Sequence, residues 1–183
     1  GVMKKFRNLS CWEIVRQISF VLEKNSKNDF MDAKEHKINY TRMGEPFLNI
    51  NEVRDAINVI EEFYPNTHHY ISTIGIKNSD FSWIKDNITL QISLHSLDEE
   101  RRNWLIPYKN KMTIKELGQI RTKSNLKTTL NLTLVDDHDF DINKLKEYFD
   151  PKYFFVKLSP INRNCISDRY GLGSGIIEAV NII

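Results

Sequence analysis

Cysteine is scarce in this sequence: Cys11 and Cys165 are the only two among 183 residues, and neither belongs to a C-x-x-C pair. Two distant thiols form neither a disulfide framework nor a zinc site, whose ligands recur at short spacing. Long apolar runs are also lacking, so no segment is expected to span a bilayer. The first six residues carry two lysines but no apolar stretch of the kind that a secretory signal requires. We therefore expect a cytoplasmic protein.

Neither sign of charge dominates the chain. The 26 Lys and Arg residues against 24 Asp and Glu residues give a net charge of +2, which is too small to indicate a polyanionic partner. The distribution is uneven, however, because residues 101–127 hold eight basic residues and one acidic residue, Glu116. This basic segment indicates either a surface that meets phosphates or a solvated helix face, and the solvated face is the more ordinary interpretation.

Hydrophobic residues make up 40% of the chain and charged residues 27%, which is typical of a soluble globular domain. A length of 183 residues fits one domain. Within it, helical and strand patterns alternate, as in β/α units that feed a parallel sheet. Ser10 and Glu13 form a capping-box pattern that predicts a helix to about Glu23.

Further elements follow from apolar periodicity and capping residues. We expect strands at residues 37–43, 68–74, 89–94, 127–135 and 153–158, and helices around 53–60, at 81–86, from 113 onward and at 141–148. Residues 163–183 receive no assignment. These elements predict an α/β fold of the partial (β/α) barrel kind with about five strands, in which the strand expected before the first helix is missing.

Three clusters are not interpreted as sites. His68 and His69 are neighbours in a predicted strand, so their side chains point to opposite faces and pack rather than share a metal. Asp137, Asp139 and Asp141 imitate the start of a calcium loop, but the glycine and glutamate of such a loop are absent, so we predict a loop and a helix cap. The glycines at 171, 173 and 175 do not follow a strand and turn, and so are a weak dinucleotide fingerprint.

Polar residues gather where four of the predicted strands end, and in a parallel barrel those ends meet at one mouth. The sequences there are Met-Gly-Glu-Pro at 43–46, Ser-Thr-Ile-Gly at 72–75, Ser-Leu-His at 93–95 and Pro-Ile-Asn at 160–162. Taken singly, each is ordinary: Glu45 suits an exposed loop and His95 a buried, hydrogen-bonded imidazole. Taken together, they favour a common site.

In order and spacing these motifs resemble the radical S-adenosylmethionine (SAM) adenine carbon-2 methyltransferases of ribosomal and transfer RNA. That family carries M-G-E-P-L-L-N, S-T-x-G, S-L-H and L-I-P-x-N in the same order. The resemblance extends over residues 1–162 and includes Arg7-Asn8-Leu9-Ser10, Glu13-Ile14-Val15, Arg102, Pro107 and Lys111. It implies that residues 1–183 are a radical-SAM core domain, with 163–183 unassigned, from a transferase that modifies RNA.

The resemblance also implies roles for single residues. A carboxylate balances the methionyl ammonium of SAM, a glycine permits close backbone approach, and an amide offers both a donor and an acceptor. The implied cofactor-binding residues are Gly44 and Glu45 for the ammonium, Ser72, Ser93, Leu94 and His95 for the carboxylate and ribose, and Asn162 for the nucleoside. Arg101, Arg102 and Lys109 are the candidates for RNA contact.

In the family, SAM is cleaved with a [4Fe–4S] cluster held by a C-x-x-x-C-x-x-C loop and fed by an electron donor. This sequence holds no such loop, and Gly1 aligns with the glycine of the family's C-A-T-G. We expect the first strand and the cluster cysteines to lie upstream of Gly1, so that the chain as given is not catalytic; truncation and lack of order both remain open as reasons. The family's methyl-carrying cysteine lies well beyond the barrel, and Cys165 is too close to Asn162 to be its counterpart.

Two departures from the family pattern leave the substrate open. Arg42 stands in place of a glycine, and Arg163 in place of a proline. Three functions therefore stay under consideration: an RNA adenine methyltransferase, a radical-SAM enzyme with a different substrate, and a non-catalytic β/α domain that binds nucleic acid or protein. Oligomeric state is not predicted by these residues.

Overall fold

The structure, a computed structural model, describes residues 7–25, 34–41, 43–135, 140–161 and 165–173. Five strands form one sheet in the order β1-β2-β3-β4-β5, and every neighbouring pair is parallel. The strands are β1 (His36–Tyr40), β2 (Thr67–Thr73), β3 (Ile88–Ser93), β4 (Thr128–Leu134) and β5 (Phe154–Pro160). The helices are α1 (Cys11–Asn25), α2 (Ile50–Phe63), α3 (Glu99–Leu105), α4 (Ile114–Gly118), α5 (Ile142–Tyr148) and α6 (Cys165–Arg169), with a short 3-10 turn η1 (Pro46–Leu48).

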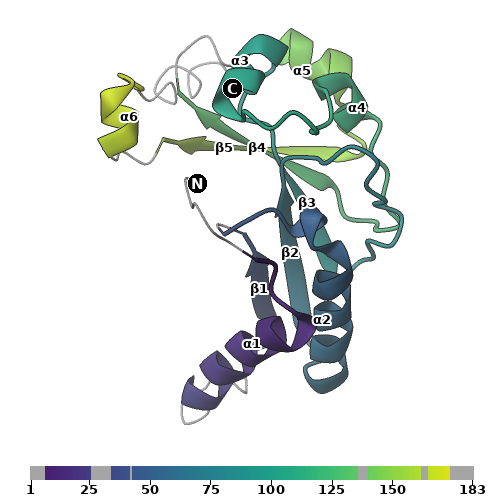
Figure 1. The fold of residues 1–183 in the computed structure, drawn as a ribbon. Coiled ribbons are helices and arrows are strands. Elements are labelled where there is room, and N and C mark those ends of the chain that lie inside the picture. The colour runs from purple at the N-terminus through teal and green to yellow at the C-terminus, as the bar shows by residue number, and fades with distance from the viewer. Residues whose placement is uncertain (1–6, 26–33, 42, 136–139, 162–164, 174–183) are drawn as a thin grey trace.

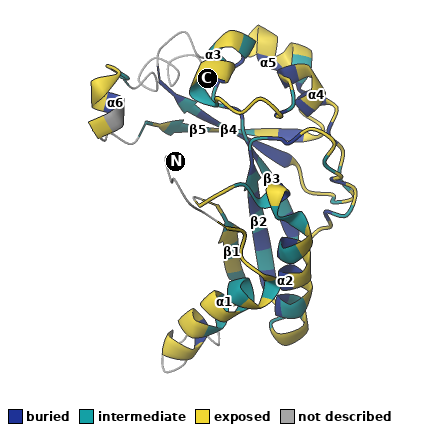
Figure 2. Ribbon diagram, viewed as in Figure 1, coloured by how far each residue is buried: buried dark blue, intermediate teal, exposed yellow. Residues whose placement is uncertain are grey.

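The predicted α/β class is confirmed, because five parallel strands and the helices that join most of them have the arrangement of a partial β/α barrel (Figure 1). One face of the sheet carries the core. Buried strand residues such as Ile71, Leu90 and Leu130 pack in a single apolar cluster with Ile57 of α2 and Leu117 of α4. The buried strand positions lie between half-buried ones, as the alternating colours along β2 indicate (Figure 2).

Local capping signals define several helix starts as predicted. The backbone N–H of Ser10 donates a hydrogen bond to the Glu13 carboxylate at 2.9 Å, and α1 begins at the next residue. Thr113 and Glu116 form the full capping box of α4. The Asp141 side chain accepts hydrogen bonds from the first turn of α5. These caps satisfy backbone donors that would otherwise lack partners, which explains why short polar motifs fix the boundaries.

One predicted boundary and one predicted helix are wrong. The first strand ends at Tyr40 instead of Met43. The expected helix at 81–86 consists of two successive turns, closed by hydrogen bonds from Ile84 N to Phe81 O (3.2 Å) and from Ile88 N to Lys85 O (2.9 Å). The Asp80 carboxylate accepts a hydrogen bond from Ser82 N at 2.8 Å. This side-chain bond competes with the backbone hydrogen bonds that a helix would form at this point.

Helix α3 was not among the predicted elements, for a physical reason. Its buried residue is Arg102, so it has no apolar stripe that periodicity could detect. Its local signals are the acidic first turn and the cap Asp98, whose carboxylate accepts from Arg101 N at 2.8 Å. Among the described residues, no helix is both long enough and apolar enough to cross a bilayer.

Candidate functional site

The face of the sheet opposite the core is lined by polar side chains. On β3, Gln91 and Ser93 are half-buried and alternate with the fully buried Leu90 and Ile92. Strand register places these polar residues in rows, because paired positions in a sheet share a face. We call this set the polar face; its residues are Ser72 and Gln91, Ser93 and Asn131, and Thr133 and Ser159, each pair in register across neighbouring strands.

Direct hydrogen bonds connect parts of the polar face. Ser72 Oγ donates to Gln91 Oε1 at 3.0 Å, and the hydroxyls of Thr133 and Ser159 lie 3.2 Å apart. A parallel sheet covered on both sides reads as a continuous apolar run, whereas these strands alternate. The alternation means that one face of the sheet is built to meet a polar ligand or water.

Glu45 lies beyond the end of β1 and is fixed by two backbone amides. Its Oε1 accepts from Phe47 N at 3.1 Å, and its Oε2 accepts from Ile74 N at 2.9 Å, just past the end of β2. A carboxylate offers about four acceptor positions, so two remain for a ligand. Gly44, directly before it, has a φ of +82° that favours glycine, and a Cβ added there would meet nothing within 4 Å. The pair thus offers a fixed carboxylate beside open space.

His95 follows the end of β3 in an unusual backbone conformation, with a φ of +61°. Such a conformation is uncommon for a residue other than glycine and often marks functional sites. Its Nδ1 accepts from Thr133 N at 3.3 Å, which assigns the ring proton of the neutral form to Nε2. Burial lowers the pKa of His95, and the charge of Arg102 lowers it further. His95 is therefore a neutral donor at physiological pH.

Arg102 does not face solvent, which corrects its assignment as an RNA contact. Its side chain is 0% exposed, and its guanidinium donates to Met112 O at 2.8 Å and to Ile74 O at 2.7 Å. Lys111 is also buried and donates to Asn103 Oδ1 and to Tyr108 O. Arg102 thus joins the segment after β2 to the segment after β3, whereas the side-chain bonds of Lys111 lie within the segment after β3. By contrast, Arg101 is half-buried and Lys109 is exposed.

The strand-end residues named from the sequence lie along one edge of the sheet, since all five strands are parallel. Leu94 is buried in the core, so only its backbone can meet a ligand. Gln91, Asn131 and Thr133 were not named; the alternation of polar and apolar residues in their strands is the signal that identifies them. Asn162 lies outside the described residues, as do Arg42, Arg163, Asp137, Asp139 and Gly175.

The two adjacent histidines lie on opposite faces of β2, as predicted. His69 is fully buried, with Nδ1 at 3.2 Å from the hydroxyl of Tyr40. His68 is half-buried, and its Nε2 lies 2.8 Å from Thr89 Oγ1. Their side chains therefore have separate partners and pack independently.

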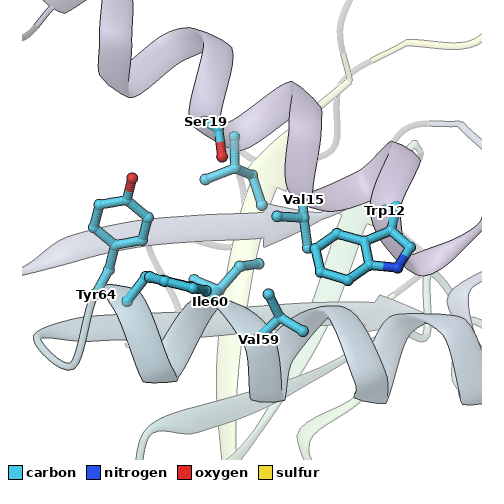
Figure 3. Close-up of a pocket in the computed structure, with 8 residues that line it drawn as sticks. Trp12, Val15, Ser19, Val59, Ile60 and Tyr64 are labelled. Atoms are coloured by element: carbon cyan, nitrogen blue, oxygen red, sulfur yellow. The ribbon is translucent and has the colours of Figure 1, made fainter.

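A pocket of about 240 Å³ lies elsewhere, between α1 and α2 (Figure 3). Its lining is mostly apolar and includes Trp12, Val15, Val59, Ile60 and Tyr64. The lining residues belong to the two helices and the residue after α2, so none of the strand-end residues takes part. The pocket lacks the convergent polar groups of the polar face, and we place the candidate site at the strand ends.

The fold and these strand-end residues define an α/β domain of the partial β/α-barrel class, with a polar sheet face that ends in a fixed carboxylate and a half-buried histidine, His95. Comparison with curated proteins then finds relatives named "Probable dual-specificity RNA methyltransferase RlmN". The one from Pseudothermotoga lettingae is 31% identical over 169 residues, which is 85% of this chain and 48% of the relative. Those from Petrotoga mobilis and Dictyoglomus turgidum are each 30% identical, over 86% and 89% of this chain.

The chain spans about half the length of the curated relatives it matches. No family model matches it, and no solved structure matches it significantly. The resemblance that the ordered motifs indicated is confirmed: over most of its length the chain is homologous to proteins named as RlmN RNA methyltransferases.

Proposed function

We propose that this chain forms the SAM-binding part of a radical-SAM enzyme that methylates adenine in RNA. Support comes from relatives that are named RNA methyltransferases and match most of the chain. Support also comes from the strand ends, where residues of the type that suit SAM share one edge of the sheet. The observation that carries the proposal is the Glu45 carboxylate, fixed by Phe47 N and Ile74 N beside the open space at Gly44.

The chemistry of SAM suits these residues. The ammonium would donate to the free acceptor positions of Glu45, and a charge-assisted pair of this kind contributes about 1.5–3 kcal/mol. Neutral hydroxyls and amides of the polar face, among them Ser72 and Ser93, would hold the carboxylate and ribose. The Nε2–H of His95 would donate to a ligand oxygen. Asn162 stays a candidate for the nucleoside by resemblance.

The cysteines of the chain do not fit a [4Fe–4S] cluster. Cys11 lies at the start of α1, and burial raises the pKa of its thiol, which disfavours the thiolate. Cys165 lies at the start of α6 and is exposed. Three thiolates cannot be assembled from these two residues, so the chain's own contribution is to bind and orient SAM.

Calorimetric titration of the chain with SAM tests the proposal. Replacing Glu45→Gln removes the negative charge at nearly constant size, and we expect at least about tenfold weaker binding because a charge-assisted hydrogen bond is lost. Glu13→Gln is the matched control, since Glu13 is a carboxylate that pairs with Arg7 at the start of α1. Equal affinity of wild type and Glu45→Gln would place the ammonium site elsewhere.

Methyl transfer requires a second test with the intact protein that contains this chain. After anaerobic reconstitution with iron and sulfide, labelled SAM and RNA should yield methylated adenine together with 5′-deoxyadenosine. Formation of 5′-deoxyadenosine without labelled RNA would instead favour a radical-SAM enzyme with another substrate. RNA binding without either product would favour a non-catalytic domain.

A further inference from the structure

An exposed aromatic cluster lies next to the strand-end edge and is not used by the proposed SAM site. Trp104 is 50% exposed and Tyr170 is 61% exposed, with their ring centroids 6.0 Å apart and their planes perpendicular. The guanidinium carbon of Arg101 lies 4.9 Å from the centroid of the Trp104 ring. We call Arg101, Trp104 and Tyr170 the rim cluster.

The rim cluster belongs to the segments that follow the carboxyl ends of two strands. Trp104 is in α3, which comes after β3, and Tyr170 directly follows α6, which comes after β5. In a parallel sheet these segments lie on the same side as the strand ends. The α3 part of the cluster is also anchored, because the neighbouring Arg102 donates to Ile74 O while Ile74 N donates to Glu45.

Trp104 is not a partly exposed member of a buried apolar helix face. Helix α3 buries Arg102 and leaves Trp104 half exposed, so the helix is inverted relative to an ordinary amphipathic one. Two acidic residues at its start have structural tasks, whereas Glu100 is exposed: Asp98 caps the helix through Arg101 N, and Glu99 accepts a hydrogen bond from Ile114 N. What the helix presents at the rim is therefore an aromatic ring with a guanidinium over it.

Aromatic rings beside a guanidinium are the groups on which unpaired nucleotides stack, and every base offers a face for such stacking. A protein interface is less well matched, because Asn103 and Lys109 near the cluster are exposed and polar and would interrupt an apolar contact. The cationic Arg101 adds attraction for phosphate.

We propose that the rim cluster stacks an unpaired nucleotide that flanks the modified one, and so helps to present single-stranded RNA to the strand-end site. This inference rests on the proposed function, since it takes RNA as the substrate. Trp104 and Tyr170 provide the stacking surface, and Arg101 neutralises a neighbouring phosphate. Recognition by such a surface tolerates any base but requires that a base be present.

Fluorescence anisotropy with a short labelled single-stranded RNA tests the rim cluster. Trp104→Ala and Tyr170→Ala should each weaken binding by roughly 5- to 150-fold, because stacking contributes about 1–3 kcal/mol per base. Trp104→Phe, which keeps a ring, should retain most of the affinity. Trp12→Ala is the matched control, since Trp12 is 68% exposed but lies in the α1–α2 pocket, and it should bind RNA as the wild type does.

An RNA with abasic sites separates stacking from a purely structural role. Wild type should bind it more weakly than intact RNA, whereas Trp104→Ala should bind the two alike. This comparison also works with Tyr170→Ala if Trp104→Ala fails to fold. Arg101→Gln should make the salt dependence shallower by about one unit of the log–log slope, whereas Trp104→Ala should leave that slope unchanged.

Two results would overturn the inference. If the wild type binds RNA but Trp104→Ala and Tyr170→Ala bind it equally well, the rim cluster has no part in RNA binding, and the proposed function stands. If the wild type binds no RNA at any salt concentration, the rim cluster and the RNA substrate fail together, and a protein partner is favoured; the Glu45→Gln titration with SAM then still reports on the cofactor site.

Discussion

The guanidinium of Arg102 donates to the carbonyl oxygen of Ile74 at 2.7 Å, 28 residues earlier in the chain. The N–H of Ile74 donates in turn to Glu45 at 2.9 Å. Arg102 also donates to Met112 O, and Met112 N donates to Gly75 O at 2.8 Å, which closes a ring of hydrogen bonds. The position of Glu45 thus depends on a charge that is buried in α3.

Replacing Arg102→Met should lower the free energy of unfolding by about 2–4 kcal/mol, because two carbonyl groups lose a charged donor. Urea denaturation followed by circular dichroism measures the loss. Arg101→Met is the matched control on the same helix, and it should cost less than about 1 kcal/mol because Arg101 is half-buried and its cation–π contact with Trp104 is partly exposed. Equal losses for the two variants would contradict a structural role specific to Arg102.

Gly118, at the end of α4, is in close contact with the backbone of α5. A Cβ added at this position would lie 2.1 Å from Tyr148 O, which cannot move without shifting the helix. Gly118→Ala should therefore destabilise the protein by about 1–3 kcal/mol, as expected for overpacking. Gln119→Ala, at the exposed neighbouring position, should change the urea midpoint only slightly. An unchanged midpoint for Gly118→Ala would mean that α4 and α5 are not packed so closely.

Much of the fold could be predicted because its signals are local. Apolar alternation identified all five strands to within a few residues, and the polar caps at Ser10, Thr113 and Asp141 identified three helix starts. A capping side chain interacts within its own turn, so its effect is encoded in a few consecutive residues. The order of the strand-end motifs likewise needs no knowledge of distant contacts.

The features that escaped prediction depend on contacts between distant segments. Helix α3 is held by Arg102 through carbonyl groups of two other segments, which no periodicity reveals. The pairing of Ser93 with Asn131 depends on strand register. Trp104 and Tyr170 lie close together although they belong to segments that follow different strands, β3 and β5. Sequence patterns specify which face a strand residue takes, but only the assembled sheet specifies its neighbours.

The capping box of α4 provides a local test of stability. Thr113 Oγ1 accepts from Glu116 N at 3.2 Å, and Thr113 N donates to Glu116 Oε2 at 2.6 Å. Thr113→Ala should cost about 1 kcal/mol, whereas Thr113→Ser keeps the hydroxyl and should cost little. Urea denaturation of both variants measures the difference. A serine variant as unstable as the alanine variant would assign the effect to the lost methyl group instead of the cap.

His69 gives the protein a pH dependence whose sign follows from its environment. The ring is fully buried between β1 and α2, where Tyr40 lies 3.2 Å from Nδ1 and Glu61 lies 3.9 Å from Nε2. Burial lowers the pKa of His69 to about 4, and the nearby Glu61 only partly opposes this effect. In the unfolded chain the imidazole pKa returns to about 6.5.

Between those two pKa values the unfolded chain binds a proton that the folded protein does not bind. Folding stability is therefore complete above about pH 6.5 and falls as the pH decreases toward 4, by roughly 3 kcal/mol for one group with this shift. His69→Gln keeps an acceptor for Tyr40 but does not titrate, so its stability should depend less on pH in this window. Urea midpoints of both proteins at several pH values from 7 to 4 measure this pH dependence. Because His95 titrates in both proteins, its contribution cancels in the difference between them. Parallel curves would show that His69 is not the group responsible.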